Sequence, residues 1–245
     1  MKLFDILRVL DGIAPFDLAE KWDNVGLLVG DADQEIRKAV ISLDPALDVI
    51  IKAEETGCDL IITHHPLFIE PLKNLNLKDV TALKTGRLLK AGISLVAMHT
   101  NLDAAEGGVA DILALALGLR GIESKGYFRV GTIEPAPLYD WVKALPFKNA
   151  RISDTGKKAG RIAACPGSGM SLWREAVDAG CDTIVTGDVK YHPAMEAFEN
   201  GLNVVDLGHY GTESIIVGPF AERLGRLLKG VEISPYSGRD IFITV

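Results

Sequence analysis

All five histidines of this chain stand just beyond short apolar runs that predict strands, and none falls within a helix-like segment. They are His64, His65, His99, His192 and His209. In open parallel sheets, ligands bind at the carboxyl ends of the strands. The placement therefore favours one shared site that uses imidazole nitrogens.

His64 and His65 are adjacent and are followed by Pro66. Neighbouring residues on a strand point to opposite faces, so both rings can converge only where the strand has ended and the backbone turns. Pro66 makes continuation as a helix or a central strand difficult. An adjacent histidine pair in a loop is more often surface decoration than a ligand pair, but the buried strand just before it favours a ligand role.

Two carboxylates stand four residues after a histidine, Asp103 after His99 and Glu213 after His209. If a helix begins near His209, then His209 and Glu213 lie on one face of its first turn. Each acid has an alternative role as a residue that the helix dipole favours at a helix start. This alternative stays open for both acids.

The proposed ligands supply three imidazoles, two carboxylates and no thiolate, and they are His64, His65, Asp103, His209 and Glu213. This set suits a borderline or hard divalent ion. The set is larger than a closed tetrahedral site needs, whereas two ions that share a carboxylate would use every ligand and keep positions for water. We therefore expect two divalent ions per chain in a site of the hydrolytic kind, with iron, zinc, manganese and nickel all compatible.

The elements that must position these residues occur twice along the chain. The string GCDLIIT at 57–63 recurs as GCDTIVT at 180–186, each time after a helix-like segment. Both halves then carry a strand, the pattern His-x-x-x-acid and a helix. Short β-branched runs alternate with amphipathic segments, as βαβ units require. We predict an α/β fold of two similar lobes from an internal duplication, layered α-β-α with mostly parallel sheet.

We expect the first lobe at residues 1–120, where His64, His65 and Asp103 lie, and the second at residues 121–245, where His209 and Glu213 lie. The boundary is approximate, because the stretch 121–158 joins the halves and carries one further strand and helix. We expect the two lobes to be interlaced.

Composition narrows the class of protein. At 245 residues the chain can bury a substantial core, and its net charge of −7 would repel a phosphate backbone, so duplex nucleic acid is a poor partner. Three cysteines without close pairing suit a reducing compartment. Asp5 and Arg8 interrupt the apolar N-terminus, and no run approaches the roughly 18 residues that span a bilayer. We expect a cytoplasmic protein that does not enter a membrane.

Five strings that follow one another along nearly the whole chain resemble the NIF-three-like family, which is also called GTP cyclohydrolase 1 type 2. They are WDNVGLLVG at 22–30, THHPLF at 63–68, MHTNLDAAEGG at 98–108, TGDVKYH at 186–192 and GHYGTE at 208–213. The resemblance implies the NIF-three-like fold and a toroidal homohexamer whose metal sites face an internal cavity. Longer relatives carry an extra domain between the halves, and the short connection in this chain indicates that it has none.

The resemblance also implies how the ligands divide between the two ions. By matching motif positions, His64 and Asp103 hold one ion, His65 and His209 hold the other, and Glu213 bridges them. No departure from the family pattern occurs at these five positions.

Further residues match motif positions near the family's site, namely His99, Asp188, Lys190, Tyr191 and His192. His99 and His192 are candidates for general acid–base catalysis. The more ordinary role for such residues is to orient a metal ligand or to contact substrate.

Two segments have both a structural and a functional interpretation. Trp22-Asp23-Asn24 is best interpreted as an aromatic packed at a lobe junction with capping neighbours, and the alternative is that it lines the mouth of a cavity. The glycine-rich segment 167–169 lacks the Lys-Ser/Thr of a phosphate-binding loop, so we interpret it as a turn.

The residues and the resemblance together predict a metal-dependent hydrolase that acts on a small, polar, nucleotide-like substrate. The family name points to GTP, although no guanine-reading element is visible in the sequence. A metallochaperone or iron carrier would need the same ligands and would differ by exchangeable metal without turnover. A regulatory or scaffold protein with a structural metal site is the third alternative.

Overall fold

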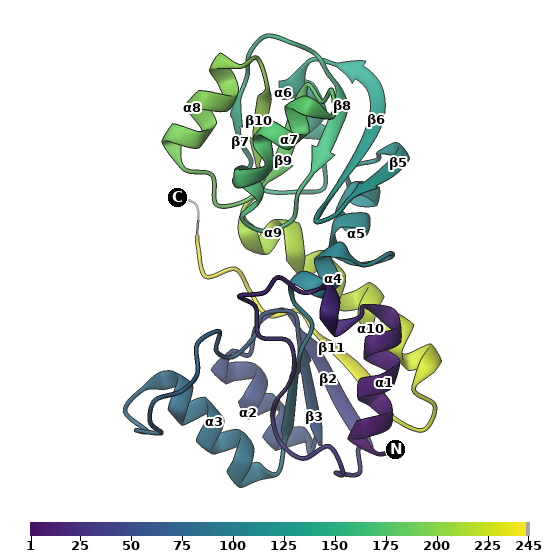
Figure 1. The fold of residues 1–245 in the computed structure, drawn as a ribbon, viewed down its shortest axis with the longest axis vertical. Helices are drawn as coiled ribbons and strands as arrows, with labels where there is room; N and C mark the ends of the chain where they lie inside the picture. The colour runs from purple at the N-terminus through teal and green to yellow at the C-terminus, as the bar shows by residue number, and fades with distance from the viewer. Residues whose placement is uncertain (244–245) are drawn as a thin grey trace. The chain divides into compact units, whose positions relative to one another are not determined.

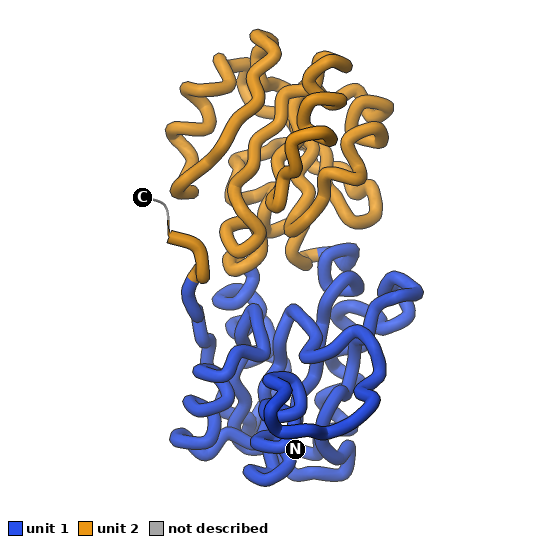
Figure 2. The backbone as a smooth tube through the Cα atoms, turned by 90° about the vertical axis from the view of Figure 1, so that its left-hand side faces the viewer, with its two compact units in different colours: residues 1–106, 216–239 blue, residues 107–215, 240–245 orange. Residues whose placement is uncertain are grey.

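The structure, a computed structural model, describes residues 1–243 and divides into two compact units. Unit 1 comprises residues 1–106 and 216–239, and unit 2 comprises residues 107–215 and, of the described C-terminal residues, 240–243. Figure 2 draws unit 1 in blue and unit 2 in orange.

The expected division at residue 120 differs from these units in two respects. Residues 107–120 belong to unit 2, and the chain returns to unit 1 at Ile216. The return has a clear cause, because strand β11 (Glu232–Tyr236) pairs in parallel with strand β2 (Lys38–Ser42) and completes the sheet of unit 1. Pairing between segments so distant in sequence leaves no trace in local periodicity.

The sheet of unit 1 has the strand order β1-β4-β3-β2-β11. The strands not yet placed are β1 (Gly26–Val29), β3 (Leu60–Thr63) and β4 (Ser94–Ala97). β4, β3, β2 and β11 are parallel, and only β1 runs antiparallel to its neighbour. The carboxyl ends of the parallel strands therefore share one edge of the sheet.

Helices cover both faces of this sheet (Figure 1). α2 (Leu47–Thr56) and α3 (Val80–Ala91) cover one face, and α1 (Leu3–Ile13) and α10 (Val217–Leu227) cover the other. The buried residues of α1 recur at helical spacing, and they are Leu3, Ile6, Leu10 and Ile13. The short helices η1 (Phe16–Leu18) and α4 (Thr100–Ala104) complete the unit.

The sheet of unit 2 has the order β5-β6-β8-β9-β10-β7. Its strands are β5 (Arg120–Lys125), β6 (Phe128–Ala136), β7 (Arg151–Ser153), β8 (Ala159–Ala164), β9 (Thr183–Thr186) and β10 (Asn203–Asp206). β8, β9 and β10 are parallel, while β5, β6 and β7 pair antiparallel. The layered α/β prediction is confirmed, but in unit 2 only this central trio is parallel.

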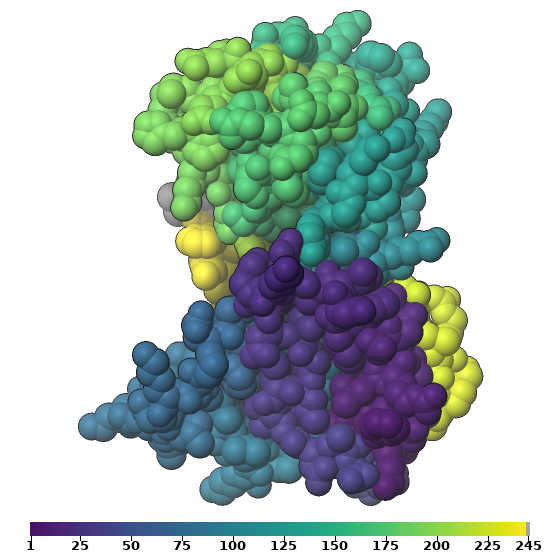
Figure 3. Space-filling model, in the orientation of Figure 1, coloured from purple at the N-terminus to yellow at the C-terminus, as the bar shows by residue number. Residues whose placement is uncertain are grey.

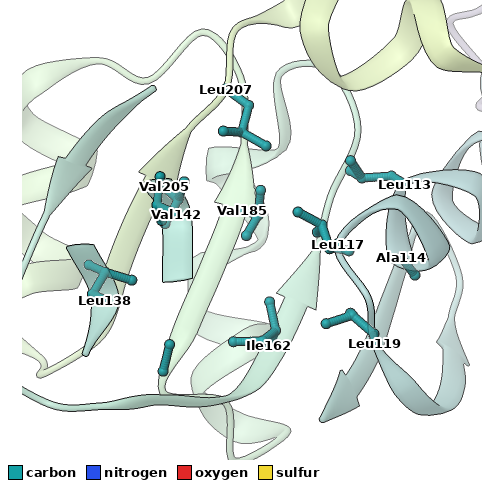
Figure 4. Close-up of a cluster of buried hydrophobic side chains, with 12 residues drawn as sticks. Leu113, Ala114, Leu117, Leu119, Leu138, Val142, Ile162, Val185, Val205 and Leu207 are labelled. Atoms are coloured by element: carbon teal, nitrogen blue, oxygen red, sulfur yellow. The ribbon is translucent and has the colours of Figure 1, made fainter. Parts of the chain in front are cut away.

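Two hydrophobic cores lie on the two faces of that sheet. α5 (Val109–Ala116) and α6 (Leu138–Ala144) contribute to one core, and α7 (Trp173–Asp178) and α8 (Tyr191–Glu199) contribute to the other. Figure 4 shows the first core, with side chains of Leu113, Leu117, Ile162, Val185 and Val205 among those gathered there. The remaining short helices are η2 (Gly169–Leu172), α9 (His209–Glu213) and η3 (Ser214–Ile216).

The repeated string Gly-Cys-Asp has the same structural role in both units. Gly57 and Gly180 follow a helix with positive φ of 63° and 75°, a conformation that favours glycine. The two aspartates, Asp59 and Asp182, then accept hydrogen bonds from backbone N–H groups where the neighbouring strand starts. The donors are Arg37 and Lys38 in unit 1, and Gly160 and Arg161 in unit 2. Shared local chemistry of this kind supports an internal duplication.

The surface of unit 1 carries the N-terminal helix and a long segment between β3 and α3 (Figure 3). Leu75 and Leu77, near the end of that segment, and Val80, the first residue of α3, are each more than half exposed. Among the described residues, no helix is long and apolar enough to cross a membrane.

Arg129 in β6 is the largest fully buried side chain of the described chain, at 2% exposure. Its guanidinium donates to Asp111 of α5 and, through Nη1, to the Gly126 carbonyl 2.8 Å away. Removal of one partner of a buried ion pair costs roughly 3–5 kcal/mol. Because Asp111 is 21% exposed, we expect Arg129→Met to lower the free energy of unfolding of unit 2 by about 3 kcal/mol, the lower end of that range, in urea titrations.

Arg120→Met is the matched control, since Arg120 is exposed on the edge strand β5 of the same unit. Exposed substitutions of this kind change stability by about 0.5 kcal/mol or less. Equal effects of the two variants would contradict a stabilising role for the buried guanidinium.

Candidate metal centre

Three of the five histidines gather at the carboxyl ends of adjacent strands in unit 1. His64 and His65 follow β3, and His99 follows β4, whose last residue Ala97 is in register with Thr63 of β3. The ring centroids lie 5.0 Å apart for His64–His65, 5.2 Å for His64–His99 and 5.6 Å for His65–His99. One ligand nitrogen from each ring lies within 4.8 Å of the other two, so these residues could hold a metal ion.

Each of these rings is held through its Nδ1 atom by an oxygen acceptor. The acceptors are the Met98 carbonyl for His64 at 2.9 Å, Asp44 Oδ1 for His65 at 2.7 Å and Asp23 Oδ1 for His99 at 2.8 Å. Carbonyl and carboxylate oxygens accept, so Nδ1 donates and carries the proton in each ring. The lone pair of the neutral imidazole is then on Nε2, the arrangement typical of metal-ligating histidines.

Asp103 lies in the short helix α4, close to His64. Its Oδ1 atom is 3.6 Å from His64 Nε2, and the His64 side chain is 1% exposed. That separation is too long for a hydrogen bond between the two atoms. It is suitable for two ligands of one ion, since metal–ligand bonds from nitrogen and carboxylate oxygen are about 2.0–2.2 Å long.

Asp23 holds the ring of His99, whereas the sequence predicts only a capping role for it. Its side chain is 0% exposed and accepts hydrogen bonds from the Thr100 N–H at 3.1 Å and the Thr100 hydroxyl at 2.5 Å, besides His99. Burial alone raises the pKa of this carboxyl, but the hydrogen bonds from His99 and Thr100 outweigh it and lower the pKa to about 2. Asp23 is therefore anionic at neutral pH and fixes the orientation of His99.

Trp22 is 57% exposed, with its indole edge-on to the His99 ring at a centroid distance of 5.9 Å. The backbone beside it is fixed, because Asn24 Nδ2 donates to the Phe68 carbonyl at 2.8 Å. Within unit 1 this aromatic is an exposed neighbour of the histidine group. The expectation that Trp22 packs at a lobe junction stays a prediction.

In unit 2, His209 begins α9 and Glu213 ends it, so both lie on one face as the four-residue spacing predicts. His209 Nε2 is 3.0 Å from Glu213 Oε2, and His209 Nδ1 bonds to Asp188 Oδ2 at 2.7 Å. Asp188 adopts a positive φ of 53°, a conformation uncommon outside glycine. The turn after β9 thus holds this carboxylate in a strained position where it orients His209.

Gly167, in the predicted turn at 167–169, lies directly against Glu213. A Cβ atom at Gly167 would lie 2.1 Å from Glu213 Oε1, and its φ is 57°. The Gly167 N–H donates to the Thr212 hydroxyl at 3.0 Å, and its carbonyl accepts from the Thr186 hydroxyl at 3.0 Å. The turn therefore cradles α9, a role whose only sequence signal was the glycine pattern.

His192 stands apart from these groups. It is exposed in the first turn of α8, beside Tyr191, which is 75% exposed. Lys190 is the N-cap residue of that helix. Among the described residues, His192 belongs to none of the groups able to hold a metal ion.

The donor chemistry fits a divalent metal. Unit 1 offers three imidazoles and Asp103, and unit 2 offers His209 and Glu213, all nitrogen or carboxylate oxygen donors. Among the described residues, no cysteine belongs to a group able to hold a metal ion, and burial raises the pKa of the Cys165 and Cys181 thiols, that of Cys181 to about 11. Donors of this kind suit zinc, iron, manganese or nickel.

Comparison with known proteins gives one consistent result. The family model described as Duf34/NIF3 (NGG1p interacting factor 3) matches residues 1–238. A Campylobacter jejuni protein named GTP cyclohydrolase 1 type 2 homolog is 37% identical over 95% of this chain and 94% of its own length.

Two solved structures are similar over almost their whole length. Staphylococcus aureus protein SA1388 matches with a TM-score of 0.94 at 27% identity, covering 100% of this chain and 99% of that one. Reduced HcgD from Methanocaldococcus jannaschii matches with a TM-score of 0.84 at 34% identity, covering 96% and 97% of the two chains.

We expect Asp23→Asn to destabilise unit 1 in a pH-dependent manner. The folded pKa of about 2 lies below the ordinary value of 3.8, so this carboxylate contributes stability above pH 3.8 that is lost as pH falls through 2. The difference corresponds to about 2 kcal/mol at neutral pH. Urea unfolding of both proteins between pH 7 and pH 3 should show the gap narrowing below about pH 4. A gap that stays constant with pH would contradict the ionic role.

We expect Gly167→Ala to weaken divalent metal binding, because the added Cβ displaces the Glu213 carboxylate. The matched control is Gly156→Ala, since Gly156 also has a positive φ of 83° but nothing within 4 Å of the added atom. Both variants carry the strain of a left-handed alanine, roughly 1–2 kcal/mol. Only Gly167→Ala should also reduce metal affinity, by about tenfold or more in a chelator competition assay. Equal affinities in the two variants would contradict the cradle.

Proposed function

Because the chain belongs to the Duf34/NIF3 family, we propose that it is a metal-dependent hydrolase that holds two divalent ions and acts on a small nucleotide-like substrate. The substrate class is suggested by the names of relatives, which are called GTP cyclohydrolase 1 type 2 homolog in Campylobacter jejuni and in Clostridium perfringens. GTP is therefore the first substrate to test.

In the proposed centre, His64 and Asp103 would hold one ion, His65 and His209 would hold the other, and Glu213 would be a ligand of both. The motif resemblance supports this division of the ligands. The local chemistry of each unit supports it independently, because His64 lies beside Asp103 in one unit and His209 lies beside Glu213 in the other.

One observation carries the proposal above the others. His64, His65, His99 and His209 are each held at Nδ1 by an oxygen acceptor, which leaves Nε2 as the ligand atom. For three of them the acceptor is a carboxylate, the carboxylate–histidine pairing that surrounds bound metals. Packing alone does not require that four different histidines share this hydrogen-bond arrangement.

Two divalent ions held there would lower the pKa of water and stabilise negative charge that develops on a substrate. The protein's own contribution is orientation. Asp44 and Asp188 fix the rings of His65 and His209 and increase their basicity as ligands. The Gly167 turn keeps the Glu213 carboxylate in place. These contacts preorganise the ligands before any ion binds.

His99 and His192 are the proposed acid–base residues. Asp23 holds the Nδ1 proton of His99, so its Nε2 atom is able to accept a proton from a neighbouring group. His192 is exposed on α8, so its proposed role is to contact the substrate. Both assignments stay predictions, as do the toroidal homohexamer and the cytoplasmic location.

Metal analysis tests the centre directly. Protein purified without chelator should contain about two equivalents of divalent metal per chain. Asp103→Asn removes a ligand of one ion and should leave about one equivalent, whereas Glu213→Gln removes the bridge and should leave less than one. His192→Asn should keep the full content. Both acid substitutions preserve side-chain volume, so thermal unfolding can confirm that the variants fold.

Metal content that is unchanged in both acid variants would contradict the ligand assignment. The hydrolase proposal is tested separately, by incubating the metal-loaded protein with GTP and then with other nucleotides and following products by chromatography. Turnover that is abolished by Glu213→Gln supports it. Metal that exchanges freely with a chelator, without turnover of any nucleotide, would instead identify a metal carrier.

A further inference from the structure

We propose that the indole of Trp22 is the surface on which the planar ring of a nucleobase stacks when a nucleotide-like substrate binds. The inference rests on the proposed function, because it assigns a substrate contact at that same site. It adds a residue that contacts the base, which the ligand assignment above does not supply. Every residue that carries the inference lies in unit 1.

Trp22 presents an open aromatic surface beside the histidine group. It is 57% exposed, and its ring centroid lies 5.9 Å from that of His99. Among the described residues, this is the only ring contact that Trp22 makes. The two ring planes are 79° apart, an angle that excludes stacking between them. At least one face of the indole therefore has no aromatic partner and is available to a planar ligand.

The backbone on both sides of Trp22 is anchored to the segment that follows β4. Before it, the Glu20 N–H donates to the Thr100 hydroxyl at 2.9 Å. After it, the buried Asp23 carboxylate accepts from His99 Nδ1 at 2.8 Å and from the Thr100 N–H at 3.1 Å. The indole is therefore held in place next to His99 before any ligand binds, and a ligand that stacks on it has little ordering cost to overcome.

Packing within unit 1 does not account for an indole in this position. Large aromatic side chains stabilise a fold mainly through the area that they bury, and more than half of Trp22 remains exposed. Trp141 and Trp173, by contrast, pack against the two cores of unit 2. The apolar surface of Trp22 is therefore left for a ligand to cover.

A planar heteroaromatic ring is the ligand that suits such a surface. Stacking of a base on an aromatic side chain contributes about tenfold or more in affinity and depends little on which base is present, because every base has a π-face. Trp22 should therefore bind purine bases with little discrimination. This agrees with a sequence in which no guanine-reading element is visible.

The experiment measures binding of guanosine monophosphate, adenosine monophosphate and ribose 5-phosphate to the metal-loaded protein by calorimetry. Ribose 5-phosphate keeps the sugar and the phosphate but lacks the base. Trp22→Leu should weaken binding of both nucleotides by about tenfold or more and leave binding of ribose 5-phosphate unchanged. Trp22→Phe should retain most of the nucleotide affinity, because a phenyl ring also stacks on a base.

Quenching of tryptophan fluorescence by acrylamide is a second readout that needs no turnover. Trp22 is far more accessible than Trp173, which is 6% exposed. A nucleotide that stacks on Trp22 should therefore protect part of the fluorescence from acrylamide. This protection should be absent in Trp22→Phe, in which the stacking ring no longer contributes tryptophan emission.

Phe4→Leu is the matched control, because Phe4 is an aromatic residue of α1 in the same unit and is 54% exposed. It should bind nucleotides as the unmodified protein does. Metal analysis, thermal unfolding and size-exclusion chromatography of each variant establish that metal content, folding and oligomeric state are unchanged.

Three results would overturn the inference. The first is that the unmodified protein binds neither nucleotide, and the second is that Trp22→Leu binds both as tightly as the unmodified protein. The third is a changed oligomeric state of Trp22→Leu, which would identify Trp22 as an interface residue between copies of the chain. Failure of the proposed hydrolase is a different outcome, in which nucleotides bind through Trp22 but are not turned over.

Discussion

The hydrogen bond from imidazole Nδ1 to an oxygen acceptor is the interaction on which the candidate centre depends. It occurs at His64, His65, His99 and His209, and it selects Nε2 as the ligand atom in each ring. Each acceptor comes from the end of a neighbouring strand: Met98 follows β4, Asp44 follows β2 and Asp188 follows β9, while Asp23 precedes the antiparallel strand β1. The order of the strands in each sheet therefore brings the partners together. Loss of the acceptor would leave the ring present but free to rotate, and ligand geometry tolerates little rotation.

Much of this arrangement could be predicted from the sequence, because histidines beyond apolar runs and the repeated Gly-Cys-Asp string are local signals. The parallel strands that place His64 beside His99 follow from the alternation of strands and helices. The role of Asp44 and Asp23 as acceptors could not be predicted, although Asp44 also follows a strand. An aspartate in a loop has many roles, and its partner becomes evident only when the register between strands is known.

Interlaced lobes are expected from the sequence, but the segment that returns to unit 1 could not be identified from local signals. β11 adds to β2 through backbone hydrogen bonds, and these carry little sequence information beyond β-propensity. The antiparallel pairing of β7 with β10 also lacks a sequence signal, since β7 has only three residues. Periodicity identifies that a strand exists, whereas the choice of neighbour depends on which edge is open when the core closes.

Strain and close approach both occur beside the ligands of unit 2. Asp188 holds a positive φ, and Gly167 leaves no room for a Cβ beside Glu213. Such features lower stability and persist where the surrounding structure compensates for them. In unit 1, the buried Asp23 carboxylate is the opposite case, because the hydrogen bonds from His99 and Thr100 and the attraction of His99 outweigh its desolvation and lower its pKa to about 2. The strained turn of unit 2 and the stabilised carboxylate of unit 1 therefore both orient metal-ligand candidates, although their energetic contributions have opposite signs.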